Sequence, residues 1–283
     1  MKLVSWNIQW GRGVDGRVDL DRIVEHTRRL ADFDVLCLQE VADGYPELPG
    51  HDGGDQFAAL AQRLDGFSAI AGVATDTEGG PRGRRRFGNL LFSRLPVGPV
   101  MRHLLPWPND PAVPSMQRVA IEATLHTGFG PLRVVTTHLE YYSARQRAAQ
   151  VERMRELHRE AVAQAREPRP GDASDGPFEH APRAQATVWT GDFNFGPDAP
   201  EYARIQAPFD DATPPLRDAW RVAHPHAPHA PTVGVFDKQQ WPGPPSTFDF
   251  VFVSAGLEPR IRALQVDTDT NASDHQPVLL ELA

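Results

Sequence analysis

The chain has 283 residues, of which 40% are hydrophobic and 23% are charged, a composition typical of a folded globular protein with a large core. No run approaches the roughly 18 consecutive apolar residues that cross a bilayer, so we expect no membrane insertion. The net charge of −8 disfavours broad binding to nucleic acid, although it leaves room for a local basic patch.

Short apolar or alternating runs bounded by Gly, Pro, Asp or Asn recur along the chain, and this pattern predicts β-strands. The first run begins at the second residue and leaves no room for a charged leader, so we expect a cytoplasmic protein. The lone cysteine, Cys37, lies within the second run, where a small buried hydrophobe is expected. The expected strands are 2–8, 35–39, 68–73, 89–93, 119–125, 132–138, 187–190, 248–254, 261–266 and 278–280.

Apolar residues at helical spacing predict three helices. The first follows a possible cap at Asp19 and carries Leu20, Ile23 and Val24 on one face; the second covers 57–64 and the third 148–162. Residues 126–131 are too few for a crossover helix, which predicts an antiparallel hairpin and argues against a strictly alternating β/α barrel. We therefore expect an α/β protein with packed sheets and outer helices, in one domain spanning 1–283.

Two long segments are expected to be irregular. Residues 166–186, rich in Pro, Gly, Asp and Arg, are typical of a surface insertion. Residues 222–245 contain His224, His226 and His229 among prolines, and a loop is favoured over a zinc site because no cysteine accompanies them.

Polar residues that could carry chemistry follow the apolar strands directly. Ligands gather where strands pass into loops, because the rigid backbone there holds side chains in place. Taken singly, each of these residues is best explained as a turn former, a helix cap or a hydrogen-bonded strand end. The set comprises Asn7, Glu40, His138, Asp192, Asn194, Asp249, Asp274 and His275.

Asp249 is the hardest of these to explain structurally. It lies between Phe248 and Phe250 in an apolar strand, and a buried carboxylate without a partner is costly, so we expect His275 to pair with it. Carboxylate and Asn oxygens without a cysteine cluster suit a hard cation such as Mg²⁺ or Mn²⁺. Such a cation can neutralise phosphate charge, while an aspartate activates water and an imidazolium donates to an oxyanion.

Seven motifs together resemble the endonuclease/exonuclease/phosphatase superfamily of metal-dependent phosphoesterases, which includes DNase I-like nucleases, AP endonucleases, neutral sphingomyelinases and inositol polyphosphate 5-phosphatases. Each motif alone is weak, but all seven occur in family order over nearly the whole chain. They are Ser5-Trp6-Asn7-Ile8, Leu38-Gln39-Glu40, the segment 88–96, Thr137-His138-Leu139, Gly191-Asp192-Phe193-Asn194, Phe248-Asp249-Phe250-Val251-Phe252 and Ser273-Asp274-His275-Gln276-Pro277-Val278.

The resemblance implies a four-layer α/β sandwich, with two stacked mixed β-sheets flanked by helices and the site at one end. It implies that Glu40 is the main metal ligand, with Asn7 and Asp274 near the same ion or a second one. Asp192 would orient or deprotonate the attacking water, and Asn194 would hold that water and the phosphate. His275, polarised by Asp249, would contact the scissile phosphate, and His138 would lie near the phosphate or the leaving group.

Other implications of the resemblance concern substrate binding. DNase I-like members give the first histidine a glutamate partner, whereas this chain has Phe87-Gly88-Asn89 near that position, which makes Asn89 the candidate substitute. Ser246-Thr247-Phe248 replace the basic and aliphatic residues that many members place before the aspartate equivalent to Asp249. Arg118 is a candidate phosphate contact.

Basic and aromatic residues near these motifs admit two readings each. The arginines at 82 and 84–86, including Arg84 and Arg85, are weighed equally as a solvated loop and as a polyanion-binding patch. Tyr141, Tyr142, Arg145 and Arg147 are expected to begin the third helix, either lining the site entrance or covering the helix surface. Trp107 and Trp241 are expected to pack loops onto the core rather than to stack on a base or a lipid headgroup.

The motifs therefore predict an Mg²⁺- or Mn²⁺-dependent phosphoesterase that uses activated water without a covalent intermediate. The acidic net charge favours a small or lipid phosphodiester or phosphomonoester over DNA or RNA, although nucleic acid stays open as a substrate. A catalytically silent scaffold is the alternative from another class, and it predicts losses among the metal and acid-base positions. None of those positions is lost. No obligate protein partner is evident.

Overall fold

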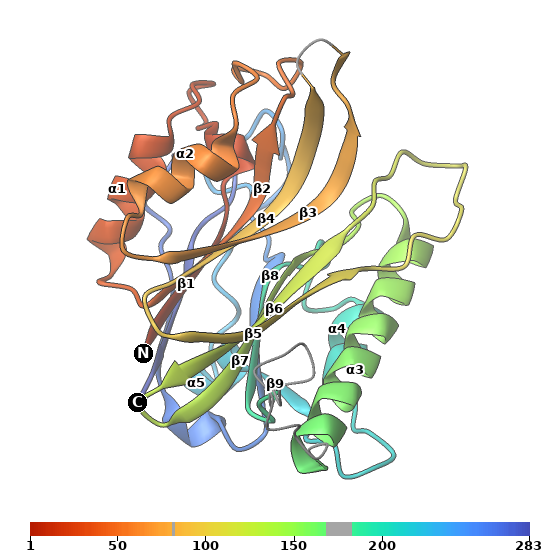
Figure 1. Cartoon of the computed structure of the whole chain (residues 1–283). Coiled ribbons are helices and arrows are strands. Elements are labelled where there is room, and N and C mark those ends of the chain that lie inside the picture. Colours follow the sequence, from red (N-terminus) through yellow and green to blue (C-terminus); the bar gives the residue numbers. More distant parts are fainter. Residues whose placement is uncertain (81–82, 168–182) are drawn as a thin grey trace, which may run out of the picture.

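The computed structural model describes residues 1–80, 83–167 and 183–283. Two six-stranded sheets face each other, and helices cover the outer face of each (Figure 1). The expected four-layer α/β sandwich is therefore confirmed. Most of the predicted insertion at 166–186, and Arg82 of the basic cluster, lie outside the described residues.

The first sheet has the strand order β11-β12-β1-β2-β4-β3. Only β1 and β2 of this sheet run parallel, and the other neighbours are antiparallel. Helices α1 (Leu20–Leu30) and α2 (Gln56–Arg63) lie against its outer face (Figure 1). The strands are β1 (Lys2–Asn7), β2 (Val35–Asp43), β3 (Ser68–Glu78), β4 (Arg84–Ser93), β11 (Ile261–Val266) and β12 (Val278–Leu282).

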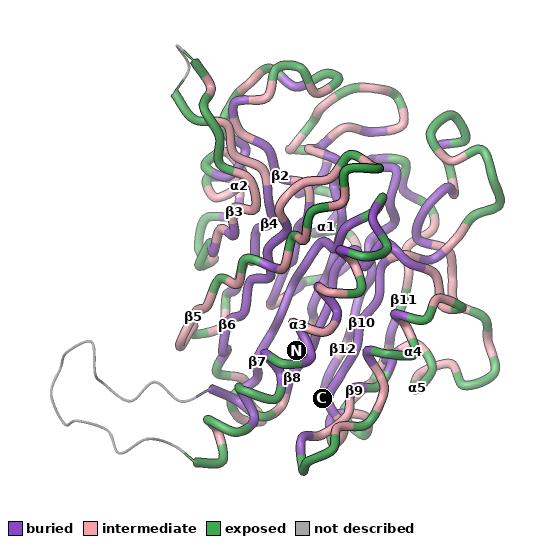
Figure 2. The backbone as a smooth tube through the Cα atoms, turned by 90° about the vertical axis from the view of Figure 1, so that its right-hand side faces the viewer, coloured by how far each residue is buried: buried purple, intermediate pink, exposed green. Residues whose placement is uncertain are grey.

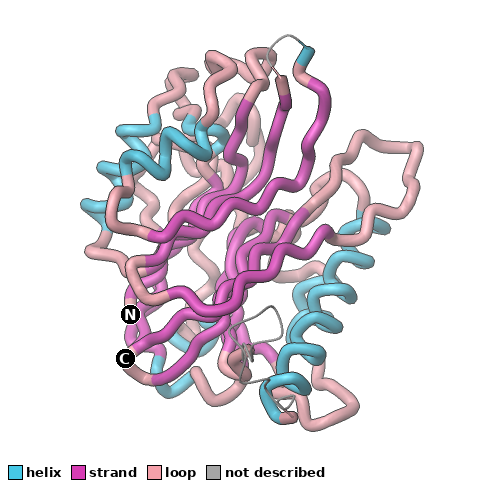
Figure 3. Tube along the Cα trace, in the orientation of Figure 1, coloured by secondary structure: helices cyan, strands magenta, loops and turns pink. Residues whose placement is uncertain are grey.

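The second sheet has the strand order β5-β6-β7-β8-β10-β9, and here β7 and β8 are the parallel pair. Helices α3 (Ala144–Arg166) and α4 (Pro200–Gln206) cover its outer face, while α5 (Ala219–Ala223) contacts β9, β10 and β11 (Figures 1 and 3). The strands are β5 (Val97–Leu104), β6 (Val119–Thr127), β7 (Gly130–His138), β8 (Thr187–Asp192), β9 (Leu216–Asp218) and β10 (Asp249–Ser254). The predicted antiparallel hairpin is confirmed as β6 and β7.

Strands buried on both faces explain why apolar residues run continuously in the sequence (Figure 2). In β2, Val35 and Cys37 face the core between the sheets, whereas Leu36 and Leu38 pack toward α1 and α2. A third cluster joins the second sheet to α3 and α4 through residues such as Trp189 and Phe193. Burial also raises the pKa of the Cys37 thiol to about 12, as expected for a structural cysteine.

Some sequence expectations need correction. Arg84 and Arg85 do not lie in a loop, because β4 begins at Arg84. Tyr141 and Tyr142 precede the third helix, which begins at Ala144 behind the Ser143 cap. β5 and β9 were not predicted. No helix among the described residues has the length and apolar content that a bilayer crossing requires.

Candidate active site at the joined ends of the two sheets

Strand direction brings the predicted residues to one end of the sandwich. β1 and β2 run parallel with Asn7 beside Gln39, so Glu40 follows at the same edge. β7 and β8 run parallel with His138 beside Asp192. Carboxyl ends of parallel neighbours meet at one edge of a sheet, which is where open α/β proteins place ligands.

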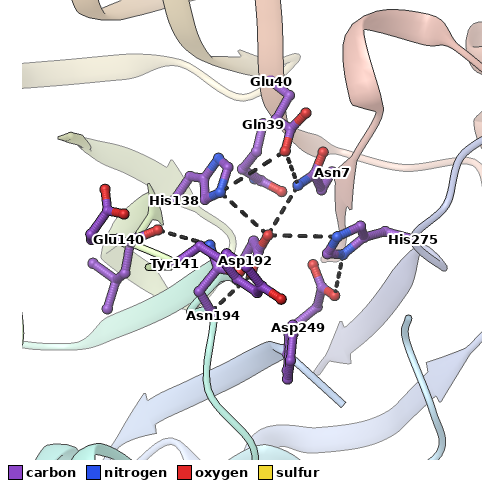
Figure 4. Close-up of polar contacts among 12 residues, drawn as sticks. Asn7, Gln39, Glu40, His138, Glu140, Tyr141, Asp192, Asn194, Asp249 and His275 are labelled. Atoms are coloured by element: carbon purple, nitrogen blue, oxygen red, sulfur yellow. Dashed lines mark hydrogen bonds and ion pairs between the residues drawn. The ribbon is translucent and has the colours of Figure 1, made fainter. Parts of the chain in front are cut away.

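Antiparallel neighbours complete the cluster. β10 begins where β8 ends, so that Asp249 is the register partner of Asp192. The segment that contains Asp274 and His275 leads into β12, the antiparallel neighbour of β1. These positions explain how residues from the two ends of the chain meet in one site (Figure 4).

Unusual backbone conformations aim two of the side chains. The pairing of β2 with β4 is interrupted by a bulge between Leu38 and Val41, and Glu40 within it has φ of 61°. Asn194, just after β8, has φ of 53°. Non-glycine residues rarely adopt such values, and they concentrate at functional sites where the surrounding structure enforces them.

Gly191 allows β7 and β8 to approach each other next to the site. Its φ is 135°, and a Cβ atom there would lie 1.9 Å from the carbonyl oxygen of Thr137. Only glycine fits this position without backbone movement. The residue thereby sets His138 and Asp192 side by side.

Asn7 and His138 contact the carboxylates of the cluster from opposite sides. The Asn7 Nδ2 group donates to Glu40 Oε1 and to Asp192 Oδ2, each at 3.0 Å, while Asn7 Oδ1 accepts from the Gln9 backbone N–H at 3.1 Å. His138 Nε2 lies 3.4 Å from Asp192 Oδ2 and 4.0 Å from Glu40 Oε1.

The predicted contact between Asp249 and His275 is present. Asp249 Oδ2 lies 2.8 Å from Nδ1 of His275, and Asp192 Oδ2 lies 3.7 Å from Nε2 of the same ring (Figure 4). Asp192 Oδ1 accepts from the backbone N–H of Asn194 at 2.9 Å, and the Asn194 side chain donates to the Leu139 carbonyl. All four residues are buried.

Burial and charge shift the pKa values of the cluster in different directions. Burial, reinforced by Asp274, raises the pKa of Glu40, and burial raises the pKa of Asp192 to about 7. Burial and the neighbouring Arg118 hold the pKa of His138 well below its usual range. Strongly separated pKa values among neighbouring groups are typical of acid-base sites.

His275 behaves differently from His138. Burial alone would lower its pKa, but Asp249 and Asp192 outweigh burial and raise the pKa of His275 well above the usual value. These opposite shifts favour a cationic His275 and a neutral His138.

The donor set suits a hard divalent cation. Ligand atoms of Glu40, His138 and Asp192 all lie within 4.8 Å of one another, and Asp274 lines the same cavity. Crowded, buried carboxylates are expensive unless a cation neutralises them, as the raised pKa values of Glu40 and Asp192 indicate. The carboxylate oxygens of this group could hold a divalent cation.

The other predicted residues are placed as follows. Arg118 lines the cavity, and its Nε donates to Glu140 Oε2 at 3.2 Å. Asn89 is buried with its amide donating to the Val119 carbonyl at 3.1 Å, and it is not among the cavity-lining side chains. Arg84 pairs with Asp76 at 2.7 Å, and Arg85 pairs with Glu47 at 3.1 Å. The structure therefore brings Arg118 to the site but not Asn89, Arg84 or Arg85.

The sequence analysis missed Gln240 and Glu140 and expected Trp241 mainly to pack a loop onto the core, whereas Trp241 lines the cavity. Gln240 and Trp241 each donate to Asp274 Oδ2, at 2.7 and 3.1 Å, across more than 30 residues of sequence. No local pattern signals such a contact. Glu140, the partner of Arg118, could have been found, because it is a carboxylate just beyond a strand end like the other candidates.

Comparisons with known proteins agree with this geometry. Residues 4–275 match the model of the endonuclease/exonuclease/phosphatase family. A crystal structure of an endonuclease/exonuclease/phosphatase from Beutenbergia cavernae is 26% identical with a TM-score of 0.64, and the match covers 100% of this chain and 72% of that one. A search of the curated proteins gave no match.

Two further structures share the fold. A mannosyl-6-phosphatase from Bacteroides thetaiotaomicron is 18% identical with a TM-score of 0.67, covering 100% of this chain and 99% of that one. A 3′ phosphatase from Neisseria, bound to a product DNA hairpin, is 21% identical with a TM-score of 0.61 and the same coverage. On its sequence match and its fold, the chain belongs to the endonuclease/exonuclease/phosphatase family of metal-dependent phosphoesterases and nucleases.

Proposed function

We propose that the protein hydrolyses a small or lipid phosphate ester with the help of Mg²⁺ or Mn²⁺. The observation that carries this proposal is the cluster of Glu40, His138, Asp192, Asp249 and His275, in which carboxylates surround two histidines whose pKa values shift in opposite directions. A catalytically silent scaffold has no need for such a combination. We also propose that residues 1–283 form one domain, a reading supported by the core shared between the two sheets.

Glu40 would hold the divalent cation, with Asp274 and Asn7 beside it. The cation would supply positive charge that offsets the charge of the phosphate group. Asn7 already joins the Glu40 and Asp192 carboxylates through its amide, so it would keep the two groups in a fixed relation. The bulge in β2 also sets the backbone position from which the Glu40 side chain extends.

Asp192 would take a proton from the attacking water. A base with a pKa of about 7 is ionised in part at neutral pH and still basic enough to accept a proton. The Asn194 backbone N–H holds Oδ1, which leaves Oδ2 directed toward the two histidines. Asn194 would thereby help to align water and phosphate.

His275 would donate a hydrogen bond to a non-bridging phosphate oxygen through Nε2, because Asp249 holds Nδ1. A preorganised cationic donor stabilises the charge that develops on phosphate in the transition state. His138, neutral and within 3.4 Å of Asp192, would lie near the leaving group. The attack of water on phosphorus would break the ester P–O bond, and the proton taken by Asp192 would pass to the departing oxygen to give the free alcohol. No covalent enzyme intermediate would form.

The net charge of −8 and the paired Arg84 and Arg85 side chains favour a small substrate over a polynucleotide. A panel of substrates with Mg²⁺ or Mn²⁺ tests the proposal: aryl phosphates, inositol phosphates, a sphingomyelin-like lipid, DNA and RNA. We expect turnover of a small or lipid ester. Turnover of DNA or RNA alone would make the protein a nuclease, and no turnover of any ester would favour the scaffold.

A further inference from the structure

The cavity above the catalytic cluster has a polar floor and an aromatic wall. Its volume is about 490 Å³, within the usual range for small-molecule sites. The wall includes Tyr141, Tyr142 and Trp241. Tyr141 and Tyr142 are 41% and 59% exposed, which is unusual for large aromatic residues beside a polar site.

The rings of the wall contact one another and the polar floor. The Trp241 indole N–H donates to Asp274 Oδ2 at 3.1 Å, and the indole ring packs edge-on against Phe248 with centroids 5.7 Å apart. The Tyr141 ring packs edge-on against the same indole, with centroids 6.0 Å apart. It also packs edge-on against the Tyr142 ring, with centroids 4.8 Å apart. A ligand that covers these rings therefore loses little energy to rearrangement of the protein.

The floor contains a hydrogen-bond donor, Arg118, with one nitrogen that has no acceptor among the described residues. Arg118 is only 6% exposed, and its Nε pairs with Glu140, whereas its Nη1 is buried and has no hydrogen-bond partner among the described residues. A buried guanidinium nitrogen without an acceptor is costly, so the site is completed by an anionic oxygen. Arg118 lines the same cavity as Tyr141 and Trp241.

The aromatic wall and the Arg118 donor together restrict the group that is attached to the phosphate through the ester oxygen. The face of a ring attached through the ester oxygen would cover the aromatic wall, whereas an acyclic polar group would leave it exposed. A polynucleotide needs a row of unpaired basic side chains along its backbone. The arginines of β4 do not provide one, because each is paired with acidic neighbours: Arg84 with Asp76, Arg85 with Glu47, and Arg86 with Asp43 and Asp55.

We propose that Tyr141 and Trp241 form a subsite for the face of a single ring, from a sugar or a nucleobase, carried through the ester oxygen of a small phosphate ester. This inference rests on the proposed function and narrows its substrate class. Tyr141 is the residue to test, because Trp241 also holds Asp274 and its loss would disturb the floor.

Equilibrium binding separates the subsite from catalysis. The probes are glucose 6-phosphate, AMP and acyclic glycerol 3-phosphate, each titrated into the Mg²⁺-loaded protein by calorimetry. We expect at least one ring-bearing probe to bind about tenfold more tightly than glycerol 3-phosphate, and Tyr141→Ala to remove that preference. Tyr141→Phe should retain it, since the ring face and not the hydroxyl is used. The sugar and nucleotide arms identify the source of the ring.

Trp107→Ala is the matched control, because Trp107 is 51% exposed but does not line the cavity. The Trp107→Ala variant should prefer ring-bearing probes over glycerol 3-phosphate to the same extent as the parent protein. The subsite is refuted if the parent protein binds all three probes equally or not at all, or if Tyr141→Ala weakens all of them alike. Ring-selective binding without hydrolysis of any ester would instead refute the proposed function and leave the subsite standing.

Discussion

Asp192 and Asp249 are directly paired on neighbouring antiparallel strands, and their carboxylates contact opposite nitrogens of one imidazole ring. Asp249 Oδ2 lies 2.8 Å from Nδ1 of His275, and Asp192 Oδ2 lies 3.7 Å from Nε2. The closer carboxylate fixes the tautomer and charge of the ring. The more distant one leaves room for a substrate oxygen near Nε2.

The Asp249–His275 pair should act as one unit. His275→Ala should lower kcat by about two orders of magnitude or more, because a cationic donor to phosphate is lost. Asp249→Asn should have a similar effect, since the amide cannot stabilise the imidazolium. The double variant should be little worse than either single variant in a double-mutant cycle of kcat. Additive losses would contradict a functional pair.

Glu40 should determine cation affinity. Glu40→Gln removes one negative charge and one ligand atom from the cluster, so calorimetric affinity for Mn²⁺ should fall at least about tenfold. The thermal unfolding temperature without metal should not fall, because the pKa of Glu40 is raised by burial and by Asp274 and the charge is therefore a cost to the metal-free protein. Exposed Glu47→Gln is the control. Unchanged Mn²⁺ affinity in Glu40→Gln would remove Glu40 from the metal site.

Gly191 is expected to be intolerant of any side chain. Gly191→Ala would place a Cβ atom 1.9 Å from the Thr137 carbonyl at a φ of 135°, so β7 and β8 would have to separate. We expect a large drop in the free energy of unfolding in urea. Gly196→Ala is the control, because a Cβ there would have no heavy atom within 4 Å. Equal stability of the two variants would show that the strands tolerate the separation.

A buried ionic cluster away from the site should make stability depend on pH. Burial opposes ionisation of Glu122, but His103, Arg133 and Arg183 outweigh it and lower its pKa to about 2. A lowered pKa contributes stability that is present above the unfolded value near 4.5 and is lost as pH falls toward 2.

Glu122→Gln should therefore be less stable than the parent protein at neutral pH, by roughly 3 kcal/mol from the pKa shift. The gap should close as the pH falls from about 5 toward 2, where the parent carboxylate also becomes neutral. Urea unfolding at several pH values measures both proteins. A gap that does not change with pH would mean that packing, and not charge, accounts for the loss.

The arginines of β4 should contribute little to substrate capture. Replacing Arg84, Arg85 and Arg86 with Ser removes exposed ion pairs with acidic neighbours, so the salt dependence of KM should stay unchanged for any turned-over substrate. Steady-state kinetics over a salt series provides the measurement. A rise in KM with a flatter salt dependence would restore the polyanion-binding reading of this cluster.

The sequence predicted most of the fold because burial on both faces leaves a strong local signal. Of the twelve strands in the part of the chain that the structure describes, ten coincide with predicted apolar runs, such as 35–39 within β2 and 278–280 within β12. β5 was missed because it is a half-buried edge strand that contains Gly98 and Pro99, and β9 because it has only three residues. The side chains of β5 do not alternate between buried and exposed in the way that the prediction requires.

The site was predictable where function lies at strand ends. Asp192 and His138 lie at the ends of two apolar runs. They lie side by side because the strands that carry them, β7 and β8, run parallel. The hydrogen bonds of Gln240 and Trp241 to Asp274 were not predictable, because they depend on how an irregular loop folds back over the site. Pairing of Arg84 and Arg85 with Asp76 and Glu47 likewise depends on strand register, which composition does not encode.

The central claim is that Asp192 activates water for attack on a phosphate ester. Its most direct test is kcat for an aryl phosphate ester with Mg²⁺ or Mn²⁺, compared between the parent protein and Asp192→Asn, which keeps the size of the side chain but removes the base. The account predicts metal-dependent turnover that falls by at least about two orders of magnitude in the variant, with unfolding temperature preserved. Undiminished turnover in Asp192→Asn would contradict it.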